Sequence, residues 1–291
     1  MARKALLVGL NHYPDPENNL KGCVNDVLLM SKLLQEAFGF DEPKNIRLLT
    51  DERATTARIT QHLAWLVGDA RPGDVLVFHY SGHGAQVRDR HGDELDDGLD
   101  EIICPYDLDW DDPFTDDDLH EIVKDVPAGA NLTVVLDCCH SGTGLREVFH
   151  PPVPLRAKRL LPPPDIRHRA NPLIEDLGEN RRLTMTRAAT ALPIRRFAAK
   201  TAAAGAILIA GCRADQVSAD AWIDGDYHGA LTYFLWKAAT QLRFSAPYAE
   251  VIKRVRALLR ENRYEQVPQL EGPGPLLGQP LFASFVPVGV A

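Results

Sequence analysis

Two short segments carry most of the residues that could perform catalysis. HYSGHG (79–84) holds His79, Ser81 and His83, and DCCHSG (137–142) holds an acid, two adjacent cysteines and a further histidine. Each segment follows an apolar run that is typical of a buried strand. A cysteine becomes a nucleophile when a nearby base or cation favours its thiolate. The pattern therefore predicts a cysteine nucleophile that is paired with a histidine.

The alternation of side chains along a strand separates the two adjacent thiols. Asp137 and Cys139 share one face, whereas Cys138 points the other way, into a helix layer. Cys139 is therefore predicted to be the nucleophile, and Cys138 to be a buried core residue. His79 lies inside an apolar strand and is interpreted as a core histidine, whereas His83 lies between two glycines and is predicted to be the general acid and base.

Strand-like and helical patterns alternate along the chain. Strands are expected at 4–11, 46–50, 74–84, 101–107, 132–137, 205–212 and 279–286. Helices are expected at 24–38, 56–70, 119–126, 230–242 and 248–262. This alternation predicts an α/β fold with a mostly parallel central sheet and helices on both faces. Sites in such sheets form at the carboxyl ends of the strands, so the two segments should meet at one edge.

The composition is that of a globular protein, with 291 residues, 45% hydrophobic and 25% charged residues and a net charge of −8. Five cysteines, an odd number, disfavour a scaffold of disulfides. No apolar run approaches the roughly 20 residues of a membrane span, and the run near the start is too short for a signal peptide. We expect a cytoplasmic protein with neither a membrane nor a nucleic-acid partner.

Charge is distributed unevenly along the chain. Residues 89–118 contain 14 acidic residues and one base, whereas residues 151–204 contain 11 lysines and arginines and 4 acidic residues. The usual interpretation of such runs is a solvated loop. The basic segment is also rich in proline and interrupts the alternation of strands and helices, so it is interpreted as a long loop or linker.

The order of the motifs along the chain resembles that of the metacaspases, which are caspase-type cysteine peptidases of family C14. The similar segments are ALLVGLNHY, LKGCVNDV, LLTD, GDVLVFHYSGHG, GDELDDGLDEIICPYD, TDDDLHEIV, LTVVLDCCHSGTG, AGCRADQVSADA and VPQLEG. The resemblance implies a caspase-like (caspase-hemoglobinase) fold and a single catalytic domain over 1–291. It divides this domain into a large-subunit-like region at 1–149, a basic linker at 150–200 and a small-subunit-like region at 201–291.

The resemblance implies a cysteine endopeptidase that uses a dyad of Cys139 and His83. The backbone N–H groups of Gly84 and Cys139 would stabilise the oxyanion, and His83 would protonate the leaving amine. One alternative is a catalytically silent caspase-like scaffold, against which the intact dyad argues. A second alternative is a calcium-responsive binding module, which an Arg-peptide assay with and without calcium would distinguish.

The resemblance also implies an acidic pocket for an Arg or Lys side chain. The matching positions are Asp26, Asp137, Cys23 and Ser81. From the residues alone, Asp137 shares the strand face of Cys139, and Asp26 has a second interpretation as the N-cap of a helix. The expected partners are protein or peptide substrates with Arg or Lys before the cut, and the expected state is a monomer.

Calcium is a further implication of the resemblance. Asp100, Asp116 and Asp117 match three of four family ligands, and carboxylate oxygens suit calcium. The fourth position is Arg146, whose positive charge would repel the ion, and the adjacent Glu147 is the alternative ligand. No organic cofactor is expected.

The basic segment begins next to the predicted nucleophile. Its basic residues include Arg156, Lys158, Arg159, Arg167, Arg169, Arg181, Arg182, Arg187, Arg195 and Arg196. Exposed loops of this composition are frequent sites of proteolysis. We expect the chain to cut itself after one or more of these residues. The alternatives are a solvated insertion and a segment that folds over the pocket as an inhibitor without being cut.

Overall fold

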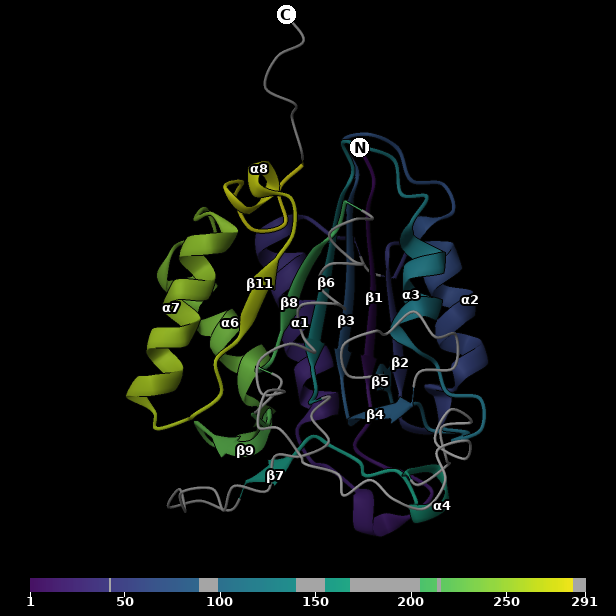
Figure 1. Ribbon diagram of the computed structural model, residues 1–291. Coiled ribbons are helices and arrows are strands. Elements are labelled where there is room, and N and C mark those ends of the chain that lie inside the picture. Colours follow the sequence, from purple (N-terminus) through teal and green to yellow (C-terminus); the bar gives the residue numbers. More distant parts are fainter. Residues whose placement is uncertain (42, 89–98, 140–154, 168–204, 214–215, 285–291) are drawn as a thin grey trace, which may run out of the picture.

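A six-stranded sheet forms the centre of the fold (Figure 1). The structure is a computed structural model that describes residues 1–41, 43–88, 99–139, 155–167, 205–213 and 216–284. The strand order is β11-β8-β6-β3-β1-β2, and all neighbours are parallel except β11, which is antiparallel to β8. The strands are β1 (Arg3–Gly9), β2 (Ile46–Thr50), β3 (Val75–Ser81), β6 (Asn131–Asp137), β8 (Ile207–Ala210) and β11 (Gln269–Glu271).

Helices cover both faces of this sheet (Figure 1). One face packs against α1 (Cys23–Phe38), α6 (Ala230–Gln241) and α7 (Tyr248–Glu261), and the other against α2 (Thr56–Val67) and α3 (Asp116–Val123). Along β6, Val135 joins the first core cluster, whereas Val134 and Leu136 join the second. Burial on both sides is the reason why the central strands are continuous apolar runs.

Smaller elements gather at the carboxyl end of the parallel strands, which is the lower end of Figure 1. A three-stranded sheet has the order β10-β9-β7, and β4 pairs with β5 in a two-stranded sheet. These strands are β4 (Gly84–Arg88), β5 (Leu99–Ile103), β7 (Arg156–Ala157), β9 (Ala219–Ile223) and β10 (Asp226–Gly229). The short helices at this end are the 3₁₀ helices η1 (Pro16–Asn18) and η2 (Asp51–Arg53) and the helix α4 (Pro164–Arg167), whereas α8 (Gly274–Leu277) lies at the opposite, upper end of Figure 1.

The expected α/β architecture is confirmed, but the predicted closing strand at 279–286 is wrong. Through residue 284 this segment forms only an isolated bridge between Pro280 and Pro247, and its last two residues lie outside the described part. Leu281 and Phe282 are buried in the core beneath α6 and α7. The run is therefore apolar because it fills the helix layer, and Pro280 has no N–H for a ladder.

The division of the chain at 149 and 201 stays a prediction. Of the basic linker, the structure describes only 155–167, and this part is ordered into β7 and α4. Among the helices that the structure describes, none is both long and apolar enough to span a bilayer.

Candidate active site

The two segments with catalytic residue types meet at the carboxyl end of the sheet. β3 and β6 pair in parallel, and Ser81 lies opposite Asp137 in the register. His83 and Cys139 each follow the last residue of their strand by two positions. The prediction that both segments lie at one edge is confirmed.

A buried acidic pocket lies at this edge, and a lysine of the same chain fills it. Asp26 of α1, Ser81 of β3 and Asp137 of β6 are fully buried, as is Lys158. Lys158 Nζ lies 2.8 Å from Ser81 Oγ, 3.2 Å from Asp26 Oδ2 and 3.4 Å from Asp137 Oδ1. The ammonium group thus donates hydrogen bonds to Ser81 and Asp26 and forms a further ion pair with Asp137.

The charges in the pocket stabilise one another. Burial acts to lower the pKa of Lys158, but nearby acidic groups, Asp137 foremost, raise it well above its usual value. Burial acts to raise the pKa of Asp26, but Lys158, with hydrogen bonds from His228 and Ser81, holds it below its usual value. The pocket therefore contains a charged lysine that is neutralised by carboxylates, which is the arrangement that makes buried charge tolerable.

Gly229, the last residue of β10, forms one wall of the pocket. Its N–H donates to both oxygens of Asp26 at 2.9 Å. Its backbone angles, φ −68° and ψ 130°, suit any residue. However, a Cβ atom here would lie less than 3.0 Å from Lys158 Nζ, Asp137 Oδ2 and Asp26 Oδ2, closer than real Cβ atoms approach other atoms. The site needs glycine for space and not for backbone conformation.

Two neighbouring elements hold the carboxylate of Asp137 in place. Thr232 of α6 donates its N–H at 2.9 Å and its hydroxyl at 2.8 Å to Asp137 Oδ2. The hydroxyl of Ser218 donates to Asp137 Oδ1 at 2.7 Å. Asp26 is not a helix cap, which corrects the alternative interpretation, because Gly22 is the N-cap of α1.

The main chain of residues 156–158 lies across the site as an extended strand. β7 pairs antiparallel with β9, and the N–H of Lys158 donates to the Ser218 carbonyl at 3.0 Å. The carbonyl oxygen of Lys158 accepts hydrogen bonds from the N–H groups of Cys139 at 3.0 Å and Gly84 at 3.2 Å. The two N–H groups that were predicted as oxyanion donors thus converge on the carbonyl of the residue that fills the acidic pocket.

The two adjacent thiols face opposite ways, as predicted from strand alternation. Cys138 joins Leu136 in the core cluster beneath α2 and α3, and burial raises its pKa. Cys139 is also buried, but its Sγ accepts a hydrogen bond from the N–H of Ser218 and lies 3.5 Å from the Ser218 carbonyl oxygen. All five cysteines are free thiols.

His83 is held by the main chain of the neighbouring loop. Its Nε2 lies 2.7 Å from the Asn18 carbonyl, and its backbone N–H donates to the Tyr13 hydroxyl at 2.8 Å. A carbonyl only accepts, so Nε2 carries the proton and Nδ1, which has no hydrogen-bond partner among the described residues, keeps its lone pair. Burial lowers the pKa of His83 to about 4, and the positive charges of Arg156 and Lys158 add to the decrease, whereas the hydrogen bond to the Asn18 carbonyl acts to raise it.

His79 and Cys23 lie in the core beside this site. His79 is fully buried, with its Nε2 3.0 Å from the Thr232 hydroxyl, and burial lowers its pKa to about 4. Cys23 is fully buried beside Ser81, and burial raises the pKa of its thiol. Of the four predicted pocket residues, Cys23 alone forms no hydrogen bond or ion pair with Lys158 in the described structure, so it shapes the wall of the pocket.

The aspartates that match calcium ligands lie on two adjoining elements. β5 carries Asp100, α3 begins with Asp116 and Asp117, and a backbone bridge joins the end of β5 to the N-cap of α3. In the part of the chain that the structure describes, no three acidic, histidine or cysteine side chains are arranged to hold a metal ion. Arg146 and Glu147 lie outside that part. Calcium binding therefore stays a prediction, and no catalytic step depends on it.

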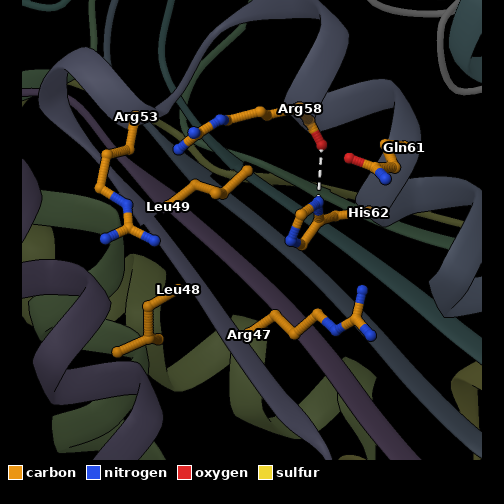
Figure 2. A pocket seen from close by; sticks show the side chains of 7 residues that line it. All are labelled: Arg47, Leu48, Leu49, Arg53, Arg58, Gln61 and His62. Atoms are coloured by element: carbon orange, nitrogen blue, oxygen red, sulfur yellow. Dashed lines mark hydrogen bonds between the residues drawn. The ribbon is translucent and has the colours of Figure 1, made fainter.

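A separate surface pocket of about 450 Å³ lies between β2 and α2 (Figure 2). Its lining residues are Arg47, Leu48, Leu49, Arg53, Arg58, Gln61 and His62. The His62 ring lies 2.9 Å from the Arg58 carbonyl, and burial, with the three arginines, lowers its pKa. This pocket is positively charged and holds none of the predicted site residues, so it does not suit a basic substrate side chain.

The fold and this site define the class of protein, a caspase-like cysteine peptidase. Caspase-1 of Spodoptera frugiperda shares the fold, with a TM-score of 0.56 at 11% identity over 93% of this chain and 86% of that chain. A protein of Geobacter sulfurreducens of known crystal structure is more similar, with a TM-score of 0.68 at 26% identity over 98% of this chain and 100% of that chain.

Sequence comparison identifies the family. A profile of the metacaspase, peptidase C14 domain matches residues 3–147. Metacaspase-1 of Schizosaccharomyces pombe is 37% identical over 94% of this chain and 68% of its own length, and metacaspase-1 of Meyerozyma guilliermondii is 35% identical over 94% and 70%. The chain belongs to the metacaspase family. It is a cysteine-type endopeptidase whose substrates are proteins.

Proposed function

We propose that this metacaspase cleaves peptide bonds after lysine or arginine, with Cys139 as nucleophile and His83 as general acid and base. The observation that carries the proposal is the placement of Lys158. Its side chain fills the acidic pocket while its carbonyl accepts hydrogen bonds from Gly84 and Cys139. A substrate residue before the cut must satisfy both conditions at once, and Lys158 does so.

The first half of the reaction transfers the acyl group to the enzyme. Nδ1 of His83 takes the thiol proton of Cys139, and Sγ forms a bond to the substrate carbonyl carbon. The N–H groups of Gly84 and Cys139 stabilise the oxyanion that develops on that carbonyl. The C–N bond then breaks, and His83 gives its proton to the leaving amine.

The second half releases the enzyme. His83 takes a proton from water, which attacks the thioester, and the product leaves with a new carboxylate while Sγ recovers its proton. In this structure the thiol of Cys139 is held by the main chain of Ser218. Attack therefore requires that Sγ leave this contact and turn toward the bound carbonyl.

The acidic pocket accounts for a preference for basic side chains. Asp26, Asp137 and Ser81 provide three acceptors for a cation and no cation of their own. An aspartate side chain in this pocket would instead meet two carboxylates, and like charges in a buried site repel strongly. Substrates that end in Asp before the cut should therefore be excluded.

The bound segment is also the proposed site of self-processing. Because Lys158 occupies the position before the cut, the bond that faces Cys139 is the one between Lys158 and Arg159. Among the predicted basic residues, Arg167 is at the end of α4, and those from Arg169 to Arg196 lie outside the described part. Until the segment is cut or displaced, it blocks the pocket for other substrates.

Peptides that copy residues 155–158 provide the test. Fluorogenic Leu-Arg-Ala-Lys and its Arg variant should be cleaved by the wild-type chain, whereas the Asp and norleucine variants should be at least about 100-fold slower, since a broken buried ion pair costs about 3–5 kcal/mol. Cys139→Ala should cleave none of them. Equal cleavage of the Asp and Lys peptides would refute the acidic pocket, and no cleavage by wild type would favour a silent scaffold.

We also propose calcium as an activator, on the resemblance of Asp100, Asp116 and Asp117 to family ligands. The same peptide assay with calcium, with magnesium and with a chelator tests this proposal. The expected result is activity with calcium that the chelator abolishes and magnesium does not restore, because calcium takes more oxygen ligands at longer distances. Full activity in the chelator would refute a calcium requirement.

A further inference from the structure

Arg156, two residues before Lys158, binds the main chain of the 3₁₀ helix η1. Its guanidinium donates from Nη1 to the Asn19 carbonyl and from Nη2 to the Glu17 carbonyl. A guanidinium is a rigid planar fork, so two carbonyls from residues that are separated by one intervening residue suit its geometry. The carbonyls at the end of a helix have no partner within the helix, which leaves them available.

The carbonyl of Asn18, which lies between those of Glu17 and Asn19, forms a hydrogen bond with His83. Asn18 is flanked by Glu17 and Asn19, and its carbonyl oxygen lies 2.7 Å from His83 Nε2. Three successive carbonyls of one turn therefore serve two groups, the outer pair binding Arg156 and the middle one orienting His83. The direction of the Asn18 carbonyl depends on the same turn that Arg156 holds.

Strand geometry makes this contact available to other substrates. In an extended chain, side chains two residues apart lie on the same side. A substrate that places its basic residue in the acidic pocket, and pairs with β9 as residues 156 and 157 do, presents its third residue before the cut to η1. In the bound segment this third residue is Arg156.

We propose that the enzyme uses an arginine at the third position before the cut to hold the η1 turn, and thereby to orient His83 through the Asn18 carbonyl. This inference rests on the proposed function, because it takes Lys158 as the residue before the cut. The arginine acts as a positioning group supplied by the substrate. Lysine is a poorer substitute, because it presents a point charge in place of a fork.

Positioning differs from simple affinity in what it changes. An arginine that only adds binding energy lowers KM and leaves kcat unchanged. An arginine that orients His83 raises kcat as well. It also places a cation near His83, which disfavours protonation, so the acid limb of the kcat profile should move to lower pH when arginine is present.

Four peptides test the proposal with the self-processed wild-type enzyme. They are Leu-Arg-Ala-Lys, its citrulline and alanine variants at the third position, and Arg-Ala-Ala-Lys, which keeps the net charge but moves the arginine to the fourth position. The first should exceed the others by about tenfold in kcat/KM, the value of one or two hydrogen bonds to a charged group, with part of the gain in kcat. With Leu-Arg-Ala-Lys, the acid limb of the plot of kcat against pH should lie at a lower pH than with the other three peptides.

The outcomes separate this inference from the proposed function. If no peptide is cleaved after Lys, the proposed function fails. If all four are cleaved within about twofold of one another, or if the difference lies entirely in KM with superimposable pH profiles, the positioning role of the third residue is refuted while cleavage after Lys stands.

Variants of the chain give an independent measurement. Arg156→Ala should slow self-cleavage about tenfold, and Arg156→Lys should fall between it and wild type. The matched control is Arg53→Ala, at the basic pocket between β2 and α2 (Figure 2), which should process at the wild-type rate. Thermal unfolding curves that coincide show that each variant is folded. Processing of Arg156→Ala at the wild-type rate would refute the inference.

Discussion

The space at Gly229 gives a sharp test of the acidic pocket. Replacement by alanine keeps the backbone unstrained, because φ −68° and ψ 130° suit any residue. The new Cβ, however, would lie less than 3.0 Å from the position of Lys158 Nζ and from Asp137 Oδ2, so a lysine or arginine side chain no longer fits. Loss of a buried ion pair costs about 3–5 kcal/mol, so kcat/KM for Lys and Arg peptides should fall at least about 100-fold.

The assay compares three chains on the same Lys and Arg peptides. Gly274→Ala is the matched control, because a Cβ at this glycine has no atom within 4 Å and its backbone is not left-handed. Wild type and Gly274→Ala should have equal kcat/KM, and Gly229→Ala should also stay uncut on a gel. If Gly229→Ala keeps kcat/KM within threefold of wild type while its melting curve is unchanged, the basic side chain does not bind in this pocket.

Three further predictions concern the nucleophile, the bound lysine and the histidine. Cys139→Ala should abolish peptide cleavage and Cys138→Ala should retain most of it, and a Lys-directed chloromethyl ketone that mass spectrometry maps to Cys138 would reverse this assignment. Lys158→Gln leaves two buried carboxylates without their cation, at a cost of about 3–5 kcal/mol, so residues 155–158 should leave the pocket. The uncut variant should then cleave peptides without the delay that self-cleavage imposes on wild type. Activity below that of uncut wild type would contradict this. In uncut Cys139→Ala, His83 should titrate at a pKa of about 4. Because this value lies below about 6.5 for the unfolded chain, the stability that neutral His83 contributes is present above pH 6.5 and lost as pH falls toward 4; an NMR midpoint at or above 6.5 would argue against it.

Strand periodicity was sufficient to predict five of the six strands of the main sheet and the meeting of its two catalytic segments, whereas β11 was not among the expected strands. The register that places Ser81 opposite Asp137 follows from two buried parallel strands, and the alternation of side chains separated Cys138 from Cys139 correctly. These features depend on local patterns, because the spacing of apolar residues along a strand, which decides which side chains are buried, can be read from consecutive residues. The family resemblance then indicated Asp26, which lies more than 50 residues along the chain from Ser81, Asp137 and Lys158.

The parts that could not be predicted depend on contacts between distant segments. Lys158 is one of ten basic residues named in its region, and nothing local distinguishes it, because its role depends on where β9 and the strand ends lie. Gly229 precedes a helix, where glycine is an unremarkable residue, and only the Asp26 and Asp137 carboxylates explain it. The apolar run at 279–286 has the composition of a strand, but the fold uses its first half to fill a helix layer.

The central claim is that residues 155–159 are bound as a substrate, with Lys158 before the bond that is cut. The most direct measurement is intact mass together with N-terminal sequencing of the wild-type chain, with Cys139→Ala and Lys158→Gln alongside. We expect the wild type to yield a new N-terminus that begins Arg159-Leu160-Leu161, and neither variant to yield it. A wild-type chain that stays uncut while it cleaves Lys peptides, or the same new N-terminus in Cys139→Ala, would contradict the claim.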